Sequence, residues 1–208
     1  PTTGEKGKPP KAVSGEDVKL AGLLDEAESR ALAVVNEKNP DLPEAQRREI
    51  ARVVGLGAVK YADLLPNRQS DYVFSWEKML ALTGNTAPYL QYAYTRTQSV
   101  LRKAREAGAD IGAGDASLTL AAAEEIVLAK HLLRFGLVLE AVGEEYRPNF
   151  LCNYLYEVAG SLSRFWESCP VLKAEGAERA SRLALCALTG QVLKQGLDVL
   201  GIGTLDQM

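Results

Sequence analysis

Apolar residues recur at three- and four-residue steps in one segment of this chain after another, and prolines or glycines separate the segments. Such a recurrence places apolar side chains along one face of an α-helix. The first series begins at Val18, and Asn39-Pro40 ends it because proline disfavours helical geometry in the residue before it. A second helix is expected from Glu44 to Leu64, with Pro66-Asn67 after it. The pattern predicts an all-α chain of roughly six or seven helices packed as a bundle.

The rest of the chain continues the helical pattern after one short exception. Asp71 to Trp76 is aromatic and β-branched, as in a strand or extended segment, but it is too isolated to found a sheet. The helices expected beyond it cover residues 77–82, 88–107, 150–167 and 175–200, with one more that begins near Asp115. In the helix expected to begin near Asp115, the stripe expected to be buried consists of Leu118, Ala122, Ile126, Ala129 and Leu133. Residues 1–17 are rich in Gly, Pro, Lys and Thr without an apolar period, and we expect them to be mobile.

The overall composition excludes several classes of function. The formal net charge is −3, whereas proteins that hold nucleic acid by bulk electrostatics are usually basic, which argues against nonspecific DNA binding. RNA binding through a local basic patch stays open. No apolar run approaches the ~20 residues that span a bilayer, and no signal peptide opens the chain. We therefore expect a cytoplasmic protein without a membrane partner.

Residues that commonly bind metals or catalyse reactions are sparse. The three cysteines are far apart without a CxxC spacing, which indicates reduced, buried thiols and no zinc site. They are Cys152, Cys169 and Cys186. The single histidine, His131, has no nearby Cys or Asp and is interpreted as a surface residue. The paired acids Glu124-Glu125 and Glu144-Glu145 point to different sides of a helix and are interpreted as solvated surface. We expect no catalytic residue and no metal site.

The segment from Pro88 to Ala107 has two unlike faces. On a wheel at roughly 100° per residue, five side chains of a core stripe fall within about 80° of one another. They are Leu90, Tyr94, Thr97, Leu101 and Ala104. On nearly the opposite side, Tyr89, Tyr92, Arg96 and Lys103 cluster within about 60°. A solvent-facing stripe is normally Glu, Lys and Gln, so this second face indicates a surface with a function.

Its chemistry suits unstacked nucleotides. Tyrosine rings are stacking platforms worth ~1–3 kcal/mol per base, and arginine offers a planar fork for phosphate or a base. The spacing alone is also compatible with a second explanation, in which the tyrosines pack beneath a neighbouring helix.

Several long stretches carry a resemblance to a known family. The stretch Gly84-Asn-Thr-Ala-Pro-Tyr-Leu-Gln-Tyr-Ala-Tyr-Thr-Arg96 closely resembles the turn and helix that open the anticodon-binding domain of arginyl-tRNA synthetases. Residues 55–64, 67–68 and 71–74 are similar to the segment between the catalytic and anticodon domains of that family. The later helices of its DALR domain resemble residues 153–160, 168–172 and 182–186, and its ending resembles residues 200–208.

The resemblance implies an all-α bundle of the class I synthetase anticodon-binding type, and it divides the chain into three parts. Residues 1–17 would be a flexible remnant of a degenerate KMSKS-type loop. Residues 18–82 would form a helical connecting region that contacts the tRNA stem, and residues 83–208 the anticodon-binding bundle.

The resemblance also assigns roles to residues. The tyrosines and the arginine that help hold the anticodon loop in the family correspond to Tyr89, Tyr92 and Arg96. A later aromatic, usually tyrosine, and a C-terminal methionine contribute to a base pocket there, and they correspond to Trp166 and Met208. Tryptophan keeps the stacking face but offers only a donor where tyrosine offers a donor and an acceptor. The implied partner is the anticodon loop of tRNA(Arg).

The resemblance places an ATP loop near the N-terminus. Lys8 and Lys11 match its lysines, whereas Ala12 and Val13 replace the family's threonine and arginine. The intact enzyme would use ATP and Mg²⁺ to attach arginine to its tRNA. The fold with the HIGH-type motif would precede Pro1. We therefore expect this chain to hold no cofactor, to be inactive alone and to partner with a catalytic domain.

Two other functions compete with the anticodon-binding hypothesis. One is a helical protein-interaction or dimerisation module that has lost RNA binding, which the acidic charge balance and the changes at Ala12, Val13 and Trp166 suggest. The other is a split enzyme that needs a separate nucleotide-binding chain.

Overall fold

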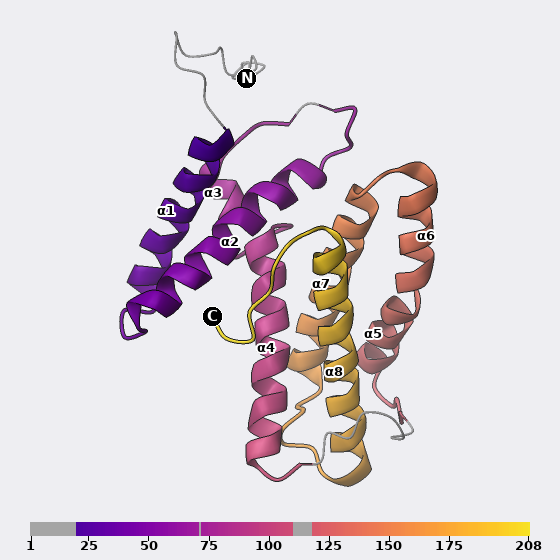
Figure 1. Cartoon of the computed structure of the whole chain (residues 1–208). Coiled ribbons are helices and arrows are strands. Elements are labelled where there is room, and N and C mark those ends of the chain that lie inside the picture. Colours follow the sequence, from indigo (N-terminus) through magenta and orange to yellow (C-terminus); the bar gives the residue numbers. More distant parts are fainter. Residues whose placement is uncertain (1–19, 71, 110–117) are drawn as a thin grey trace, which may run out of the picture.

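Figure 1 shows the computed structural model of the chain, which describes residues 20–70, 72–109 and 118–208. Its helices, in chain order, are α1 (Leu20–Lys38), α2 (Glu44–Leu64), α3 (Trp76–Met79), α4 (Ala87–Glu106), α5 (Ala123–Leu133), α6 (Phe135–Glu145), α7 (Asn149–Ser168) and α8 (Gly176–Val199). No strand occurs in these described ranges, so the all-α prediction is confirmed. None of these helices is both long and apolar enough to cross a bilayer.

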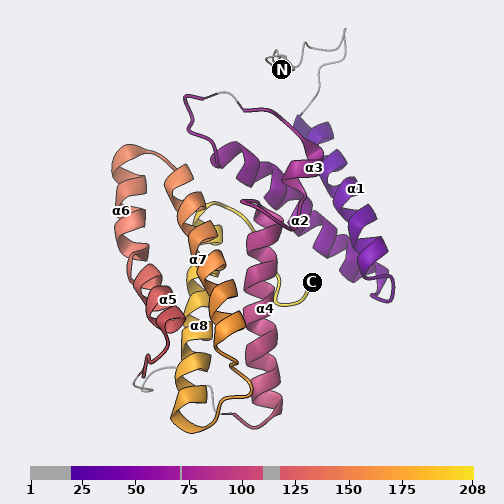
Figure 2. The same cartoon turned by 180° about the vertical axis from the view of Figure 1, so that it is seen from behind.

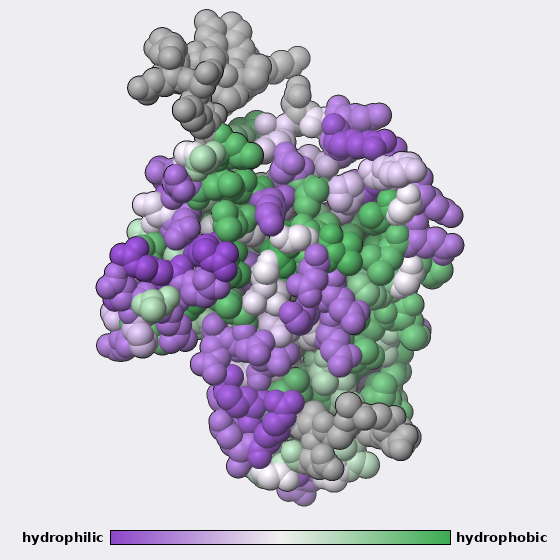
Figure 3. Space-filling model, in the orientation of Figure 1, coloured by the Kyte–Doolittle hydropathy of each residue, from purple (hydrophilic) through white to green (hydrophobic). Residues whose placement is uncertain are grey.

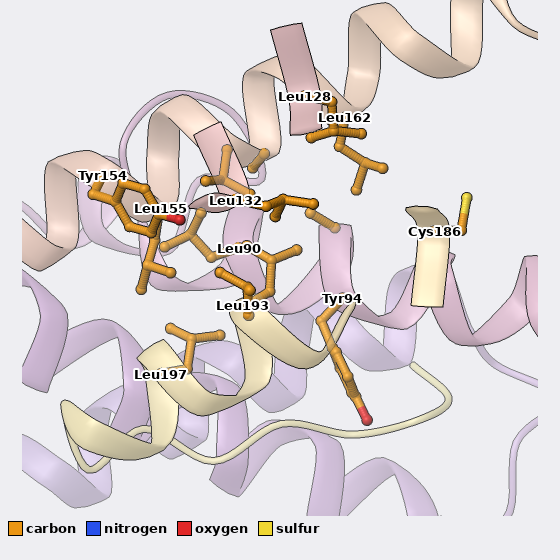
Figure 4. Close-up of a cluster of buried hydrophobic side chains, with 14 of the residues drawn as sticks. Leu90, Tyr94, Leu128, Leu132, Tyr154, Leu155, Leu162, Cys186, Leu193 and Leu197 are labelled. Atoms are coloured by element: carbon orange, nitrogen blue, oxygen red, sulfur yellow. The ribbon is translucent and has the colours of Figure 1, made fainter. Parts of the chain in front are cut away.

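The helices form a hairpin and a bundle that meet at α4. Helices α1 and α2 pack along each other as an antiparallel pair, and α2 also contacts α4 (Figures 1 and 2). Helices α4, α7 and α8 run side by side, with α5 and α6 on the other side of α7. Leucines from α4, α5, α7 and α8 fill the centre of this bundle (Figure 4), among them Leu90, Leu128, Leu155 and Leu193, which are fully buried. A smaller core, around Val35 and Ile50, lies within the hairpin.

Helix α4 begins where the sequence predicts. Thr86 caps it: the Thr86 Oγ1 accepts a hydrogen bond from the Tyr89 amide at 3.3 Å, and Pro88 occupies the first turn. The predicted core stripe is buried throughout, and it consists of Leu90, Tyr94, Thr97, Leu101 and Ala104. The opposite face of α4 is therefore the one that the bundle leaves uncovered.

The C-terminal segment after α8 is fixed to α4 by side-chain hydrogen bonds. The Gln91 amide nitrogen donates to the Gly203 carbonyl at 2.8 Å and to the Val53 carbonyl of α2 at 3.2 Å. Tyr94 donates to Asp206 Oδ1, and Thr95 to the Leu205 carbonyl, both at 2.6 Å. The chain end consequently lies between the hairpin and α4 (Figure 1).

The sequence expectation for residues 115–133 is wrong in two respects. Residues 118–122 are not helical, and α5 begins at Ala123; Asp115 lies outside the described residues. Of the predicted stripe, Leu118 and Ile126 are exposed and Leu133 is 82% exposed, whereas Leu128 and Leu132 are buried. Apolar residues surround α5 on several sides, so periodicity alone could not select the inward face. Apolar surface that the core does not cover is visible near α6 in Figure 3.

Glu125 decides which face turns inward, and it is not the solvated residue that the sequence suggested. Its side chain is 3% exposed, and its Oε1 accepts a hydrogen bond from Arg182 Nε at 2.7 Å. Oε2 accepts from the amides of Ala121 and Ala122 at 2.8 and 2.9 Å, which caps α5. Burial raises the pKa of Glu125, but the bonds from Arg182 and these amides outweigh it, so the pKa lies below its ordinary value. A buried ion pair thus ties α5 to α8. By contrast, Glu144-Glu145 is exposed, as expected.

His131 is also more enclosed than the sequence suggested. It is half-buried, and its Nδ1 lies 2.7 Å from Ser161 Oγ, so it joins α5 to α7. The three cysteines are buried and free, as predicted. Burial raises the pKa of the Cys152 and Cys186 thiols to about 12, so neither is a reactive thiolate near neutral pH.

Candidate nucleic-acid interface

The uncovered face of α4 carries the residues singled out in the sequence. Tyr92 is 45% exposed, Arg96 and Lys103 are exposed, and Tyr89 is half-buried. No described carboxylate forms an ion pair with Arg96 or Lys103. Both cations are therefore available to an anionic ligand.

Helix α7 supplies the second half of this surface. The Arg96 guanidinium carbon lies 4.4 Å from the centroid of the Trp166 ring and 5.9 Å from that of Tyr92. About two turns before Arg96 on α4, Tyr89 meets Tyr156 of α7 edge to face, with ring centroids 5.7 Å apart. We call these five residues, which line the junction of α4 and α7, the aromatic seam.

Tyr156 is the member of the aromatic seam that sequence reasoning missed. It is 38% exposed and lies well away from the buried stripe of α7, which includes Leu155, Val158 and Leu162. A wheel drawn for α7 would have placed Tyr156 on the outer face, as the wheel for α4 did for Tyr92.

The Arg96 guanidinium covers a face of the Trp166 ring, and the polar edge of the ring is turned to the interior. The indole N–H donates to the Cys186 sulfur of α8 at 3.4 Å. Since that donor is already used, the exchange of tyrosine for tryptophan removes a hydrogen-bonding group from the surface and keeps a platform for stacking.

A groove of about 300 Å³ adjoins the aromatic seam at Tyr92. Its walls come from α1, α2, the turn before α4 and the chain end. Met208 and Tyr92 both line it, so the fixed C-terminal segment places the predicted methionine beside the predicted tyrosine. Tyr92 therefore belongs to both the seam and the groove. Lys8 and Lys11 lie outside the described residues.

Comparison with known families assigns most of the chain. Residues 90–208, more than half of it, match the model of the DALR anticodon binding domain. Residues 2–76 match that of the class I (R) tRNA synthetase catalytic domain. The two matches are separated by residues 77–89, which include most of α3 and the first residues of α4, so the helical hairpin lies with one model and most of the bundle with the other.

Curated relatives and solved structures agree with this assignment. The chain is 56% identical over 205 residues to an arginine–tRNA ligase of Chromobacterium violaceum and 54% identical over 207 residues to one of Laribacter hongkongensis. Each alignment covers 99% of this chain and 35% of the relative, so the chain spans about a third of their length.

Among solved structures, the arginyl-tRNA synthetase of Thermus thermophilus matches with a TM-score of 0.83 and 36% identity, over 92% of this chain and 32% of that one. That of Plasmodium falciparum matches with 0.79 and 28%, over 92% and 34%. The chain therefore belongs to the DALR anticodon binding domain family and is similar over nearly its whole length to arginyl-tRNA synthetases.

Proposed function

We propose that this chain binds the anticodon loop of an arginine-accepting tRNA, as part of an enzyme that attaches arginine to that tRNA with ATP. The observation that carries the proposal is the contact of the Arg96 guanidinium with the rings of both Tyr92 and Trp166, beside a groove that Tyr92 shares with Met208. The proposal draws its ligand from the family to which the chain belongs.

The chemistry of the seam favours an RNA loop over a duplex. Exposed aromatic rings bind the faces of bases, and those faces are free only where bases are unstacked. Arg96 and Lys103, which lack carboxylate partners among the described residues, supply contacts for the phosphates between successive bases. Each ring that stacks on a base contributes ~1–3 kcal/mol.

The groove suits one base that leaves the stack. Its volume lies at the small end of the range of about 300–1,000 Å³ for ligand pockets. Because Tyr92 lines both sites, a base in the groove and its neighbour on the seam belong to one continuous strand. This continuity, together with the similarity to arginine–tRNA ligases, speaks against a helical interaction module that has lost RNA binding.

Catalysis belongs, in this proposal, to the whole enzyme. Among the described residues, no three His, Cys, Asp or Glu side chains gather where they could hold a metal ion together. In this proposal the intact ligase uses ATP and Mg²⁺, and no described residue is assigned to the binding of either. A role in charging tRNA is consistent with a cytoplasmic location.

Footprinting tests the proposal. The chain is titrated into an arginine-accepting tRNA, and single-strand-specific nucleases probe the RNA. We expect saturable protection of the anticodon loop, reduced in the variants Tyr89→Ala and Arg96→Ala. Protection of another part of the tRNA, or none, would contradict the proposal.

A further inference from the structure

We infer that α1 takes part in reading the base that enters the groove, through the side chains of Lys38 and Asn39. This inference rests on the proposed function and adds a specificity-determining site to it. The residues lie in the part of the chain that matches the catalytic-domain model, not the anticodon-binding model.

The groove is apolar apart from three side chains. Nine of its twelve lining residues are aliphatic, proline or methionine. The three polar ones are Lys38 and Asn39, at the end of α1, and Tyr92. Aliphatic walls and an aromatic ring hold a base by its faces without distinguishing one base from another. Among the side chains of the lining residues, only these three carry polar groups that can discriminate between bases.

Those three groups are not used by the protein itself. Within the described ranges, no hydrogen bond or ion pair involves the Lys38 ammonium, the side-chain amide of Asn39 or the Tyr92 hydroxyl. Other long polar side chains of the same hairpin are paired: Arg30 with Glu26 at 2.6 Å, and Arg48 with Glu44 at 2.6 Å. Lys38 and Asn39 thus keep free donors and an acceptor where the groove needs them.

The chain holds this end of α1 in a fixed position. The backbone N–H of Asn39 donates to the Val35 carbonyl at 2.8 Å, and the backbone carbonyl of Asn39 accepts from the Leu42 N–H at 3.3 Å. Arg47 of α2 donates to the Asn36 side chain at 2.6 Å. These bonds hold the backbone at Asn39 in place and leave the side-chain amide of Asn39 without a partner among the described residues, so it can bond to a ligand.

The occupant that fits these features is a single unpaired base. An asparagine amide presents a donor next to an acceptor and pairs with the edge of a base, and lysine adds a donor for a ring nitrogen or a carbonyl. The continuity of the groove with the aromatic seam at Tyr92 brings the same RNA strand to it. An apolar side chain of a protein partner would leave the amide and the ammonium without partners.

The test compares discrimination, not affinity alone. Dissociation constants are measured for arginine-accepting tRNA and for tRNAs in which each anticodon base is replaced singly. The proteins are the unsubstituted chain, Asn39→Ala, Lys38→Met, and Lys130→Met as a control that removes one positive charge from the exposed face of α5. Circular dichroism verifies that each variant is folded.

We expect Asn39→Ala to reduce the preference for the natural base by a factor of about 5 to 150 at one anticodon position, with little change at the others. Lys38→Met should act at the same position, and Lys130→Met should leave every ratio unchanged. If both α1 variants discriminate as the unsubstituted chain does, the inference is wrong and the proposed function stands. If the unsubstituted chain itself does not discriminate, the proposed function fails, and the inference with it.

Discussion

The guanidinium carbon of Arg96 lies 4.4 Å from the centroid of the Trp166 ring, so a cation of α4 covers the face of an indole on α7. The two residues are 70 positions apart in the sequence, and each belongs to a helix whose other side is buried in the same core. A cation over an aromatic face is stabilised by about 0.5–1 kcal/mol at an exposed site. The contact favours this arrangement in the absence of a ligand, and it places charge and aromatic surface together.

Replacement of Arg96 by alanine should weaken tRNA binding by about 1.5–3 kcal/mol, the range for a hydrogen bond to a charged group. The matched control is Lys103→Ala, which removes an exposed cation of the same helix that stacks on no ring. We expect the control to cost less than about 1 kcal/mol. Titrations at several salt concentrations check both values, and equal losses for the two variants would contradict the special role of Arg96.

Tyr92 should be the most sensitive aromatic residue, because it alone lines both the aromatic seam and the groove. We expect Tyr92→Ala to weaken tRNA binding by ~1–3 kcal/mol. Tyr92→Phe keeps the ring and loses the hydroxyl, and should cost less than about 1.5 kcal/mol. The measurement is the dissociation constant of each variant. A phenylalanine variant as weak as the alanine variant would show that the ring face is not what binds.

The hairpin of α1 and α2 depends on a glycine at its closest approach. A Cβ on Gly55 would lie 2.8 Å from the carbonyl carbon and oxygen of Ala27, and backbone atoms cannot move aside as a flexible side chain can. Gly55→Ala should destabilise the fold by about 1–3 kcal/mol and displace α1 from the groove. Gly22→Ala, with open space around the new methyl group, should be neutral or stabilising by up to about 1 kcal/mol. Urea unfolding measures the free energy of unfolding of both variants, which should fall for Gly55→Ala and stay equal or rise for Gly22→Ala.

The buried pair of Glu125 and Arg182 predicts a pH-dependent loss of stability. Removing one partner of such a pair costs about 3–5 kcal/mol, so Glu125→Gln should be less stable by that amount at pH 7. The folded state holds the pKa of Glu125 below its unfolded value of about 4.3. The stabilisation is therefore complete above that unfolded value and is lost as the pH falls through the lower, folded value.

Unfolding free energies of the two proteins at pH 7, 5, 4 and 3 test this prediction. The difference in unfolding free energy between the unsubstituted protein and Glu125→Gln should be constant down to about pH 5 and should narrow below about pH 4.3. Glu144→Gln, which changes an exposed carboxylate, should stay within about 0.5 kcal/mol of the unsubstituted protein. A gap as wide at pH 3 as at pH 7 would show that the charge of Glu125 does not stabilise the fold.

Helix boundaries could be predicted wherever a cap or a proline marked them. Glu44–Leu64 was predicted to the residue, and the start of α4 at Thr86 and Pro88 was predicted within one residue. The two faces of α4 followed from its wheel because its apolar residues occupy one side only. On α5 they occupy several sides, and the face that turns inward is set by Arg182, 57 residues later in the chain.

The site was only partly accessible from the sequence. Periodicity identified the face with Tyr92 and Arg96, and resemblance to a family added Trp166 and Met208. Neither could show that Tyr94, a member of the predicted core stripe, and Gln91, for which no role was predicted, fix the chain end that carries Met208. Lys38 and Asn39 could not be linked to the site either, because the packing of α1 against α2 brings them there through contacts distant in the sequence.

The most direct test of the account is the dissociation constant of this chain for arginine-accepting tRNA, compared with that for the same tRNA with its anticodon replaced. Base contacts on the aromatic seam and in the groove predict saturable binding of the first tRNA and a loss of at least about fivefold for the second, since one mismatched contact costs about 1–3 kcal/mol. Equal dissociation constants for the two tRNAs would contradict the account, because contacts to phosphates alone do not depend on the anticodon bases.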